Sequence, residues 1–364
     1  MTVDYIALAS HHSTCCRGDV KDGQERAAHE LRALPLLAIG VAELGAAISA
    51  AIGPWLPHDA LRLVGTSPAT GLGQGSFSFW HRYEEELVRS LLARRSTGHG
   101  DPCRPAALAR QRVPAAVARG AEGGGGELRV LLRDGRGVWG LLGLVRAGDA
   151  RPFREDDVRR AVQLGPALMT LLRRHVTAAP LAPTIPALPA GVITVSAGQA
   201  IRTVTPQAQA WLNLLGRQGT PGWLMPAVVT ALALDARANV HRTACPTAGG
   251  TAAGAGRSLV CAPPAGFGRW LMIEGQALDA HGTGDVAVVI QSPAAALVLP
   301  SFCDWYALTP RERQVLELLC RGAAPKQVAR LLGLSAHTVH DHLKALFRKT
   351  GAGGRDELMA AFTA

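Results

Sequence analysis

Lysine is scarce in this 364-residue chain, although its formal net charge is +10. Arginine supplies most of the positive charge, and the only lysines are Lys21, Lys326, Lys344 and Lys349. Three of these four lie within residues 309–364, where nine Lys and Arg stand against five Asp and Glu. The resulting charge of +4 in so short a segment suits a polyanionic partner for the end of the chain.

Cysteine is also infrequent, with seven residues and no C-x-x-C pair. An odd, scattered set fits a reducing cytoplasm better than a disulfide scaffold. Metal-ligand side chains cluster once near the N-terminus, at His11, His12, Cys15 and Cys16. No second cluster matches this one, so we expect a flexible leader over residues 1–30, with no metal site and no cofactor.

The first twenty positions contain no visible signal peptide, because Asp4 and other polar residues interrupt them. The nearest approach to a membrane span is the apolar run 33–56, which is long enough to cross a bilayer. Glu43 lies in its middle, and proline and glycine interrupt it. We therefore expect a buried or dimer-facing helix in a cytoplasmic protein that does not enter a membrane.

Short catalytic motifs are missing as well. The chain has no G-x-S-x-G elbow, no Walker loop and no H-E-x-x-H pair. The glycine-rich segment 71–75 is not followed by a Lys-Ser/Thr pair, so it predicts a plain turn. Isolated Ser, His and Asp residues occur without a spacing that would bring them together. We predict that the protein is not an enzyme.

The clearest local signal in the first half is a hairpin, in which apolar runs at 127–133 and 138–145 flank an Asp134-Gly135 turn. An acidic start at 155–157 and apolar residues at 3.6-residue spacing then predict one long helix. Two earlier expected elements are a strand at 61–64 and an amphipathic helix at 79–95. The order over 31–176 resembles a GAF sensory domain, which implies ligand binding or dimerisation and fixes no ligand.

Four prolines predict a semi-stiff linker over 177–190. Two strand-like runs, two helices and three further strand-like runs follow, at 191–195, 200–204, 207–215, 223–236, 257–261, 269–274 and 285–290. This order over 191–292 resembles a PAS domain. The resemblance leaves two alternatives open, an apolar ligand pocket or a purely structural, dimerising fold. A second linker is expected over 293–307.

Residues 308–364 predict four short helices separated by glycine stops. Thr309 and Glu312 form a capping box with proline at the first helical position. Ala324 precedes the second helix, which therefore lacks the usual side-chain cap, at a cost of about 1 kcal/mol. Ser335 is the expected N-cap of the third helix. The residues of the second helix expected to face inward are Val328, Ala329, Leu331 and Leu332.

The third helix is predicted to have two contrasting faces. Its apolar stripe, which would pack on the first two helices, consists of Val339, Leu343, Leu346 and Phe347. The opposite face, at 100° per residue, carries His337, Asp341, Lys344, Ala345 and Arg348, flanked by Thr338 and His340. A helix that is buried along its back and polar and cationic along its front has the geometry to enter a DNA major groove.

Several short matches mark residues 308–362. They are Leu-Thr-Pro-Arg-Glu at 308–312, Ser-x-x-Thr-Val-x-x-His at 335–342, and Lys-x-Gly at 349–351 followed by an acidic-Leu helix. The segment resembles the LuxR-type (GerE-type) helix-turn-helix. Behind GAF-like and PAS-like regions, this arrangement resembles one-component regulators of actinobacteria.

The resemblance implies a role for each of several residues. The predicted base-reading residues are His340, Asp341 and Lys344, and the predicted phosphate contacts are Lys326, Thr338, Arg348 and Lys349. The last helix, 356–362, would pair two such domains. Lysine can donate a hydrogen bond to guanine, and aspartate can accept one from cytosine, which agrees with base-reading roles for Lys344 and Asp341.

Three neighbouring positions need separate comment. The family usually has Lys or Arg where this chain has His340, so the charge at that position depends on pH. His342 is expected to pack or to bond within the helix. Arg311 and Arg313 could either meet phosphates or stay solvated, and the sequence leaves both alternatives open.

Together these patterns predict a multidomain α+β protein, with GAF-like and PAS-like α/β sensory domains ahead of an all-α four-helix LuxR-type helix-turn-helix. We expect a sequence-specific DNA-binding transcription regulator that reads the major groove as a homodimer. Its expected partners are double-stranded DNA, RNA polymerase and an unidentified small molecule. The alternative is a non-catalytic sensory scaffold that acts through protein contacts.

Overall fold

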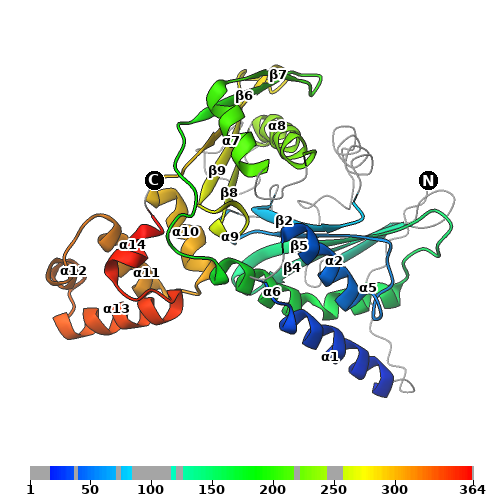
Figure 1. The fold of residues 1–364 in the computed structure, drawn as a ribbon, viewed down its shortest axis with the longest axis horizontal. Coiled ribbons are helices and arrows are strands. Elements are labelled where there is room, and N and C mark those ends of the chain that lie inside the picture. The colour runs from blue at the N-terminus through cyan, green and yellow to red at the C-terminus, as the bar shows by residue number, and fades with distance from the viewer. Residues whose placement is uncertain are drawn as a thin grey trace. The chain divides into compact units, whose positions relative to one another are not determined.

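The computed structural model describes residues 17–36, 40–70, 75–83, 116–119, 126–216, 222–243 and 257–362 (Figure 1). The chain forms two compact units. The first contains residues 1–66, 71–174 and 219–227, and the second contains 67–70, 175–218 and 228–364.

The first unit is built on an antiparallel sheet that follows the order β2-β1-β5-β4-β3 in the described residues. Its strands are β1 Ala60–Gly65, β2 Phe77–His81, β3 Ala116–Arg119, β4 Gly126–Asp134 and β5 Gly137–Arg146. Its helices are α1 Arg17–Ala33, α2 Val41–Ile52, α5 Glu155–Gln163 and α6 Gly165–Ala178, the last of which continues into the second unit.

The predicted hairpin is confirmed by β4 and β5, which pair around the turn with one register shift between Leu132 and Arg133. Asp134 is the Cα partner of Gly137, and the Asp134 Oδ1 accepts a hydrogen bond of 2.8 Å from the backbone N–H of Arg136. The side-chain acceptor of Asp134 therefore closes the two-residue turn, as an Asp-Gly sequence favours.

Two expectations for the first unit were wrong. Residues 79–81 belong to the strand β2 and not to a helix, because alternate buried aromatic side chains, Phe77 and Phe79, suit pairing with β1. The remainder of the expected helix, from residue 84, lies outside the described residues. The expected leader is helical from Arg17, where α1 buries Ala27 and Leu31 on one side.

The long helix expected after the hairpin is interrupted. Its first part, α5, ends at Gln163, and α6 begins at Gly165. Pro166 has no backbone N–H to continue the α5 ladder, which explains the break.

The apolar run 33–56 contains the helix α2, whose Glu43 accepts a hydrogen bond of 3.3 Å from the backbone N–H of Gly40. Gly45 of this helix lies directly on β2, because a Cβ at this position would come within 1.9 Å of the carbonyl oxygen of Trp80. None of the helices in the described ranges combines the length and apolar character that a membrane span needs.

The second unit has its own antiparallel sheet in the order β7-β6-β10-β9-β8. The strands are β6 Gly191–Val195, β7 Ile201–Val204, β8 Arg257–Ala262, β9 Leu271–Ala277 and β10 Val286–Gln291. The helices that accompany this sheet along the chain are α7 Pro206–Gly216, α8 Leu224–Thr243, whose first four residues belong to the first unit, and the short α9 Pro264–Phe267. Numbered from the first strand of each sheet, both sheets run 2-1-5-4-3, so the chain carries the same strand order twice.

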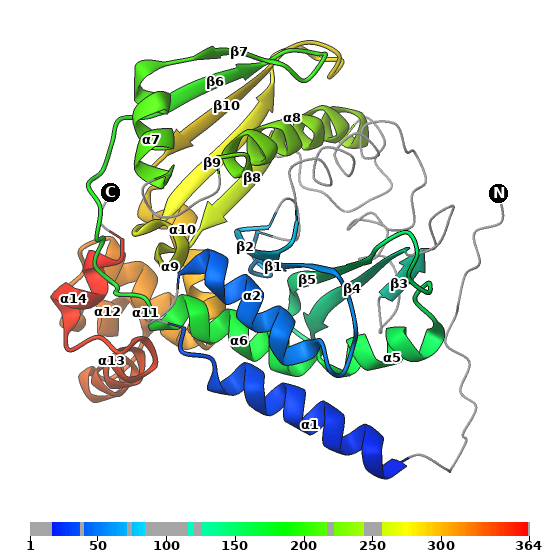
Figure 2. The same cartoon turned by 45° about the vertical axis from the view of Figure 1, so that its right-hand side comes forward.

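Helices α7 and α8 lie on one face of the second sheet (Figure 2), and both approach it closely. A Cβ at Gly191 on β6 would come within 2.4 Å of the Cα of Ala208 on α7. Ser258 on β8 donates a 2.8 Å hydrogen bond to the carbonyl oxygen of Leu232 on α8. Trp211 on α7 is fully buried, and its indole N–H donates a 2.9 Å hydrogen bond to the carbonyl oxygen of Pro189. Close backbone approach and a large aromatic side chain leave little free volume at these contacts.

The expected linker over 293–307 is largely helical. The helix α10 runs from Ala295 to Trp305 and contains Pro300 in its interior. Phe302 on α10 is fully buried, and its ring lies 6.5 Å from that of Trp270 and 4.4 Å from that of Tyr306, measured between centroids. Burial of these aromatic side chains, rather than local propensity, stabilises a helix that contains a proline.

Candidate nucleic-acid interface

Four helices gather at the end of the second unit (Figure 1). They are α11 Pro310–Cys320, α12 Pro325–Leu332, α13 Ala336–Thr350 and α14 Arg355–Ala360. Gly333, with φ of 63°, ends α12 in the left-handed conformation that favours glycine, and Ser335 then starts α13 two residues later. This is a helix-turn-helix arrangement with α13 as the second helix.

The helix starts are fixed by local hydrogen bonds. Thr309 Oγ1 accepts from the backbone N–H of Glu312 at 3.3 Å, and Glu312 Oε2 accepts from that of Thr309 at 2.7 Å. Ser335 Oγ accepts from the backbone N–H of Thr338 at 3.0 Å. These caps set the direction in which α11 and α13 begin.

The start of α12 has one of the two hydrogen bonds of a capping box. The Gln327 side chain accepts a 2.8 Å hydrogen bond from the backbone N–H of Ala324, whereas Ala324 has no side-chain acceptor to offer in return. One of the free backbone donors at this helix start is therefore satisfied despite the missing cap.

The apolar back of α13 is buried, and its polar front is exposed. Val339 and Leu346 are fully buried, Leu343 is 8% exposed, and Phe347, the fourth residue of the predicted stripe, is half-buried. The residues of the opposite face that are exposed are His337, Asp341, Lys344 and Arg348, together with the flanking His340. Ala345, Thr338 and His342 are half-buried. The helix is thus held by its back, and its front is available to a partner.

Asp341 lies close to a second polar side chain of this front. Its Oδ2 is 3.5 Å from the Nε2 of His337 one turn earlier. Both side chains are largely solvent-exposed, so an exposed pair of this kind contributes at most a few tenths of a kcal/mol. The carboxylate of Asp341 therefore remains accessible to a hydrogen-bond donor outside the protein.

The cations considered in the sequence analysis differ in their contacts. Lys326, Lys344 and Arg348 are exposed, and within the described residues none of them forms a salt bridge. Arg313 pairs with Glu317 at 3.1 Å, and Arg311 donates to Gln314 at 2.7 Å and to the carbonyl of Leu332.

Lys349 differs from the exposed cations because its ammonium is engaged inside the protein. Its Nζ lies 2.7 Å from Glu312 Oε2 and 3.1 Å from the carbonyl oxygen of Ala307. Burial raises the pKa of the Glu312 carboxyl, but the hydrogen bonds from Lys349 and from the Thr309 N–H outweigh burial and hold that pKa below its usual range. The phosphate contact predicted for Lys349 is not tested by the structure, and a phosphate would have to compete with this ion pair.

One inward assignment on α12 was wrong. Leu331 is 66% exposed, whereas Val328 and Ala329 are buried. On a 3.6-residue helix, positions 328, 329 and 332 share one side, and Leu331 lies away from it. Sequence reasoning also missed the contact between Lys349 and Glu312, since the two residues are 37 positions apart.

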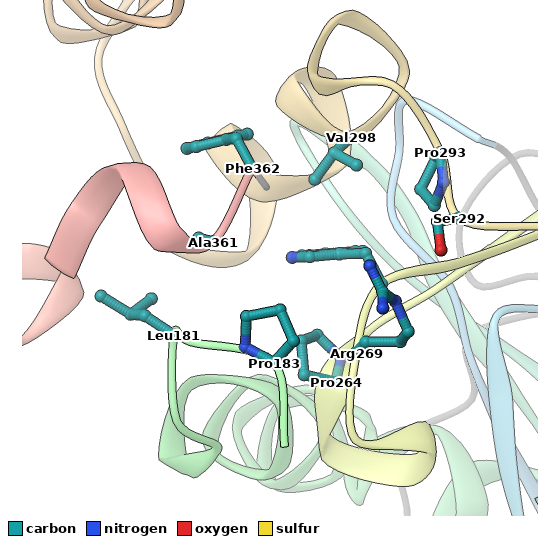
Figure 3. A pocket seen from close by; sticks show the side chains of 10 residues that line it. Leu181, Pro183, Pro264, Arg269, Ser292, Pro293, Val298, Ala361 and Phe362 are labelled. Atoms are coloured by element: carbon teal, nitrogen blue, oxygen red, sulfur yellow. The ribbon is translucent and has the colours of Figure 1, made fainter. Parts of the chain in front are cut away.

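The residues that follow α14 pack within the second unit. The Phe362 ring lies 4.8 Å from that of Phe302 on α10, and Ala361 is 4% exposed. Beside them is a small cavity with a volume of about 10 Å³, into which the side chain of Arg269 points (Figure 3). That volume holds about one water molecule, so this cavity is too small for an organic ligand.

The fold and exposed face define the class of this domain as a helix-turn-helix. Residues 306–362 match the model of the family described as bacterial regulatory proteins, luxR family. The C-terminal domain of this chain is therefore a LuxR-type helix-turn-helix, and the chain is homologous there to transcriptional regulators.

Two relatives illustrate the similarity. The transcriptional regulatory protein UhpA of Escherichia coli (strain K12) is 51% identical over 51 residues, which is 14% of this chain and 26% of UhpA. A putative HTH-type transcriptional regulator in the exeN 3' region of Aeromonas salmonicida is 46% identical over 55 residues, 15% of this chain and 28% of that protein. The match thus spans about a quarter of the length of these relatives.

Proposed function

We propose that this protein is a transcription regulator that binds double-stranded DNA through its C-terminal domain. The observation that carries the proposal is the pair of faces on α13. The apolar back is buried against the domain, and the front exposes Lys344 and Arg348 without intramolecular salt bridges in the described residues. A helix of this kind can enter a major groove and meet both bases and phosphates.

The base-reading residues that we propose are His340, Asp341 and Lys344. Lys344 can donate to guanine O6 or N7, and Asp341 can accept from the amino group of cytosine. Both side chains are exposed on the front of α13, one turn apart. His340 is exposed at the edge of the same face and adds a donor or an acceptor according to its tautomer.

Phosphate contacts are proposed for Lys326, Thr338 and Arg348. Lys326 is exposed in the first turn of α12, and Arg348 is exposed in the last turn of α13. Cations at the two ends of the helix-turn-helix could therefore meet the backbone on both sides of a groove. Thr338 is half-buried and already hydrogen-bonded to Ser335 Oγ at 2.8 Å, so its hydroxyl hydrogen is free to donate to a phosphate when Ser335 is the donor of that bond.

For the other domains we propose GAF-like and PAS-like roles, supported by the repeated 2-1-5-4-3 order of the two sheets. The close approach of α7 at Gly191 favours a structural, dimerising second domain over a ligand-filled one. One small domain reads few base pairs, so we propose that two copies bind half-sites about one helical turn apart. RNA polymerase is the proposed further partner of a regulator of this kind.

Electrophoretic mobility shifts of the full-length protein on genomic fragments test the proposal. Binding should be detectable at about 50 mM salt and should weaken steeply by about 200 mM, because cations on the protein release counterions from the phosphates. The Lys344→Ala/Arg348→Ala variant should lose binding. Arg136→Ala, which removes an exposed cation from the hairpin turn of the first unit, is the control and should bind as the wild type does.

The alternative is a sensory scaffold that acts through protein contacts. Absence of binding at low salt by a correctly folded wild-type protein would favour this alternative. Equal binding by wild type and the Lys344→Ala/Arg348→Ala variant would instead mean that the front of α13 is not the interface.

A further inference from the structure

Lys349 occupies the last turn of α13, yet its ammonium does not point toward the exposed front. It forms an ion pair of 2.7 Å with Glu312, the third residue of α11, and donates at 3.1 Å to the carbonyl oxygen of Ala307. The Lys349 side chain is 25% exposed and the Glu312 side chain 7% exposed. Water screens a pair so placed less than it screens a surface pair.

The same carboxylate oxygen has two functions. Glu312 Oε2 accepts both the Lys349 ammonium and the backbone N–H of Thr309, which is the N-cap of α11. Removal of Lys349 or of Glu312 would leave the remaining charge partly buried and without its hydrogen-bond partner. Lys349 therefore joins the end of α13 to the start of α11.

Ala307 lies in the turn between α10 and α11 and has a φ of 52°. This left-handed conformation costs an alanine roughly 1 kcal/mol, so other contacts have to maintain it. Its backbone N–H donates to the carbonyl of Asp304 at 3.1 Å, and its carbonyl accepts from Lys349. Lys349 thus contacts the one strained residue of the turn that leads into the helix-turn-helix.

We propose that Lys349 is a positioning residue, which fixes the C-terminal end of the recognition helix α13 to the α10–α11 turn and neutralises no DNA phosphate. The proposal rests on the DNA-binding function proposed above. The contact couples the angle between α10 and α11 to the position of α13, because a backbone change at Ala307 moves the carbonyl oxygen that accepts a hydrogen bond from Lys349.

The test measures DNA binding of full-length variants over a salt series. Lys349→Met lowers the net charge by one, and Glu312→Gln raises it by one while keeping an oxygen that can accept from the Thr309 N–H. If Lys349 positions α13, both variants weaken binding by about tenfold, the effect of losing a charged hydrogen bond worth about 1.4 kcal/mol. The slope of log K against log[salt] should stay at the wild-type value in both.

Arg348→Gln is the matched control, because it removes an exposed cation from the neighbouring position. It should reduce that slope by about 0.9 for each domain bound. The double variant Lys349→Met/Glu312→Gln should bind no worse than the weaker single variant, since both substitutions break the same contact.

Two results would overturn the proposal: a lower salt slope for Lys349→Met, or unchanged or tighter binding by Glu312→Gln. If Lys349→Met unfolds at the assay temperature, the Glu312→Gln variant decides alone. Weaker DNA binding at the wild-type salt slope supports the proposal, and unweakened binding overturns it. Failure of the wild-type protein to bind DNA at low salt would reject the proposed function instead, so the two failures are distinguishable.

Discussion

Substitution of Lys344 should separate base reading from phosphate binding. Lys344 and Arg348 are four residues apart on α13, so they lie on one face with about 6 Å of helix rise between them. Both are exposed, and neither forms a salt bridge within the described residues. Removal of either charge should therefore leave the domain folded and change only its interaction with a partner.

The two losses should differ in kind. A good contact to a base edge is worth about 1–3 kcal/mol of discrimination, or roughly 5-fold to 150-fold, whereas a phosphate contact carries no sequence information. Lys344→Ala should lower affinity for the preferred duplex by such a factor and affinity for a scrambled duplex much less. Arg348→Ala should lower both affinities by similar factors and reduce the salt slope.

Fluorescence anisotropy of the two labelled duplexes, titrated with the wild-type protein and with each variant, measures all six affinities, and repetition over a salt series gives the slopes. Equal losses on both duplexes for Lys344→Ala would make Lys344 a phosphate contact and refute its assignment as a base reader. Equal affinity of the wild-type protein for both duplexes would refute sequence-specific reading altogether.

Three further substitutions test the fold and its caps. Gly191→Ala should destabilise the second unit by about 1–3 kcal/mol in urea unfolding, because the new methyl group would overlap Ala208, whereas Gly216→Ala has open space and should cost far less. Ser335→Ala should lower the free energy of unfolding by about 1 kcal/mol, since the first turn of α13 loses its cap. Burial lowers the pKa of His175 to about 4, so the folded state resists protonation of this side chain. The free energy of unfolding should therefore fall by up to about 3 kcal/mol as the pH drops from about 6.5 toward 4. His175→Gln should remove that part of the pH dependence.

Local signals predicted the elements that local chemistry determines. The Asp134-Gly135 turn predicted the hairpin because aspartate and glycine satisfy that turn without help from the rest of the chain. The capping residues of α11 and the glycine after α12 predicted the boundaries of the helix-turn-helix in the same way. For such elements the sequence contains the acceptor, the donor and the permissive backbone within a few residues.

Distant contacts determine what the sequence did not predict. The segment from Phe77 pairs with β1, and that pairing makes it a strand although its apolar spacing also suits a helix. The helix α1 was missed because, among its residues of described burial (22–33), only Ala27 and Leu31 mark the buried side of a largely polar segment. The engagement of Lys349 depends on a carboxylate 37 residues earlier, and no spacing rule connects the two.

Selection of bound duplexes from a random-sequence DNA pool by full-length protein measures whether α13 reads DNA sequence. Sequencing of the bound fraction should yield one enriched motif, in two half-sites about one helical turn apart. Lys344→Ala should relax the preference at defined positions of each half-site. A bound fraction with no enriched motif at low salt, or an enriched motif unaffected by Lys344→Ala and by removal of Asp341 and His340 together, would contradict the assignment of α13 as the reading helix.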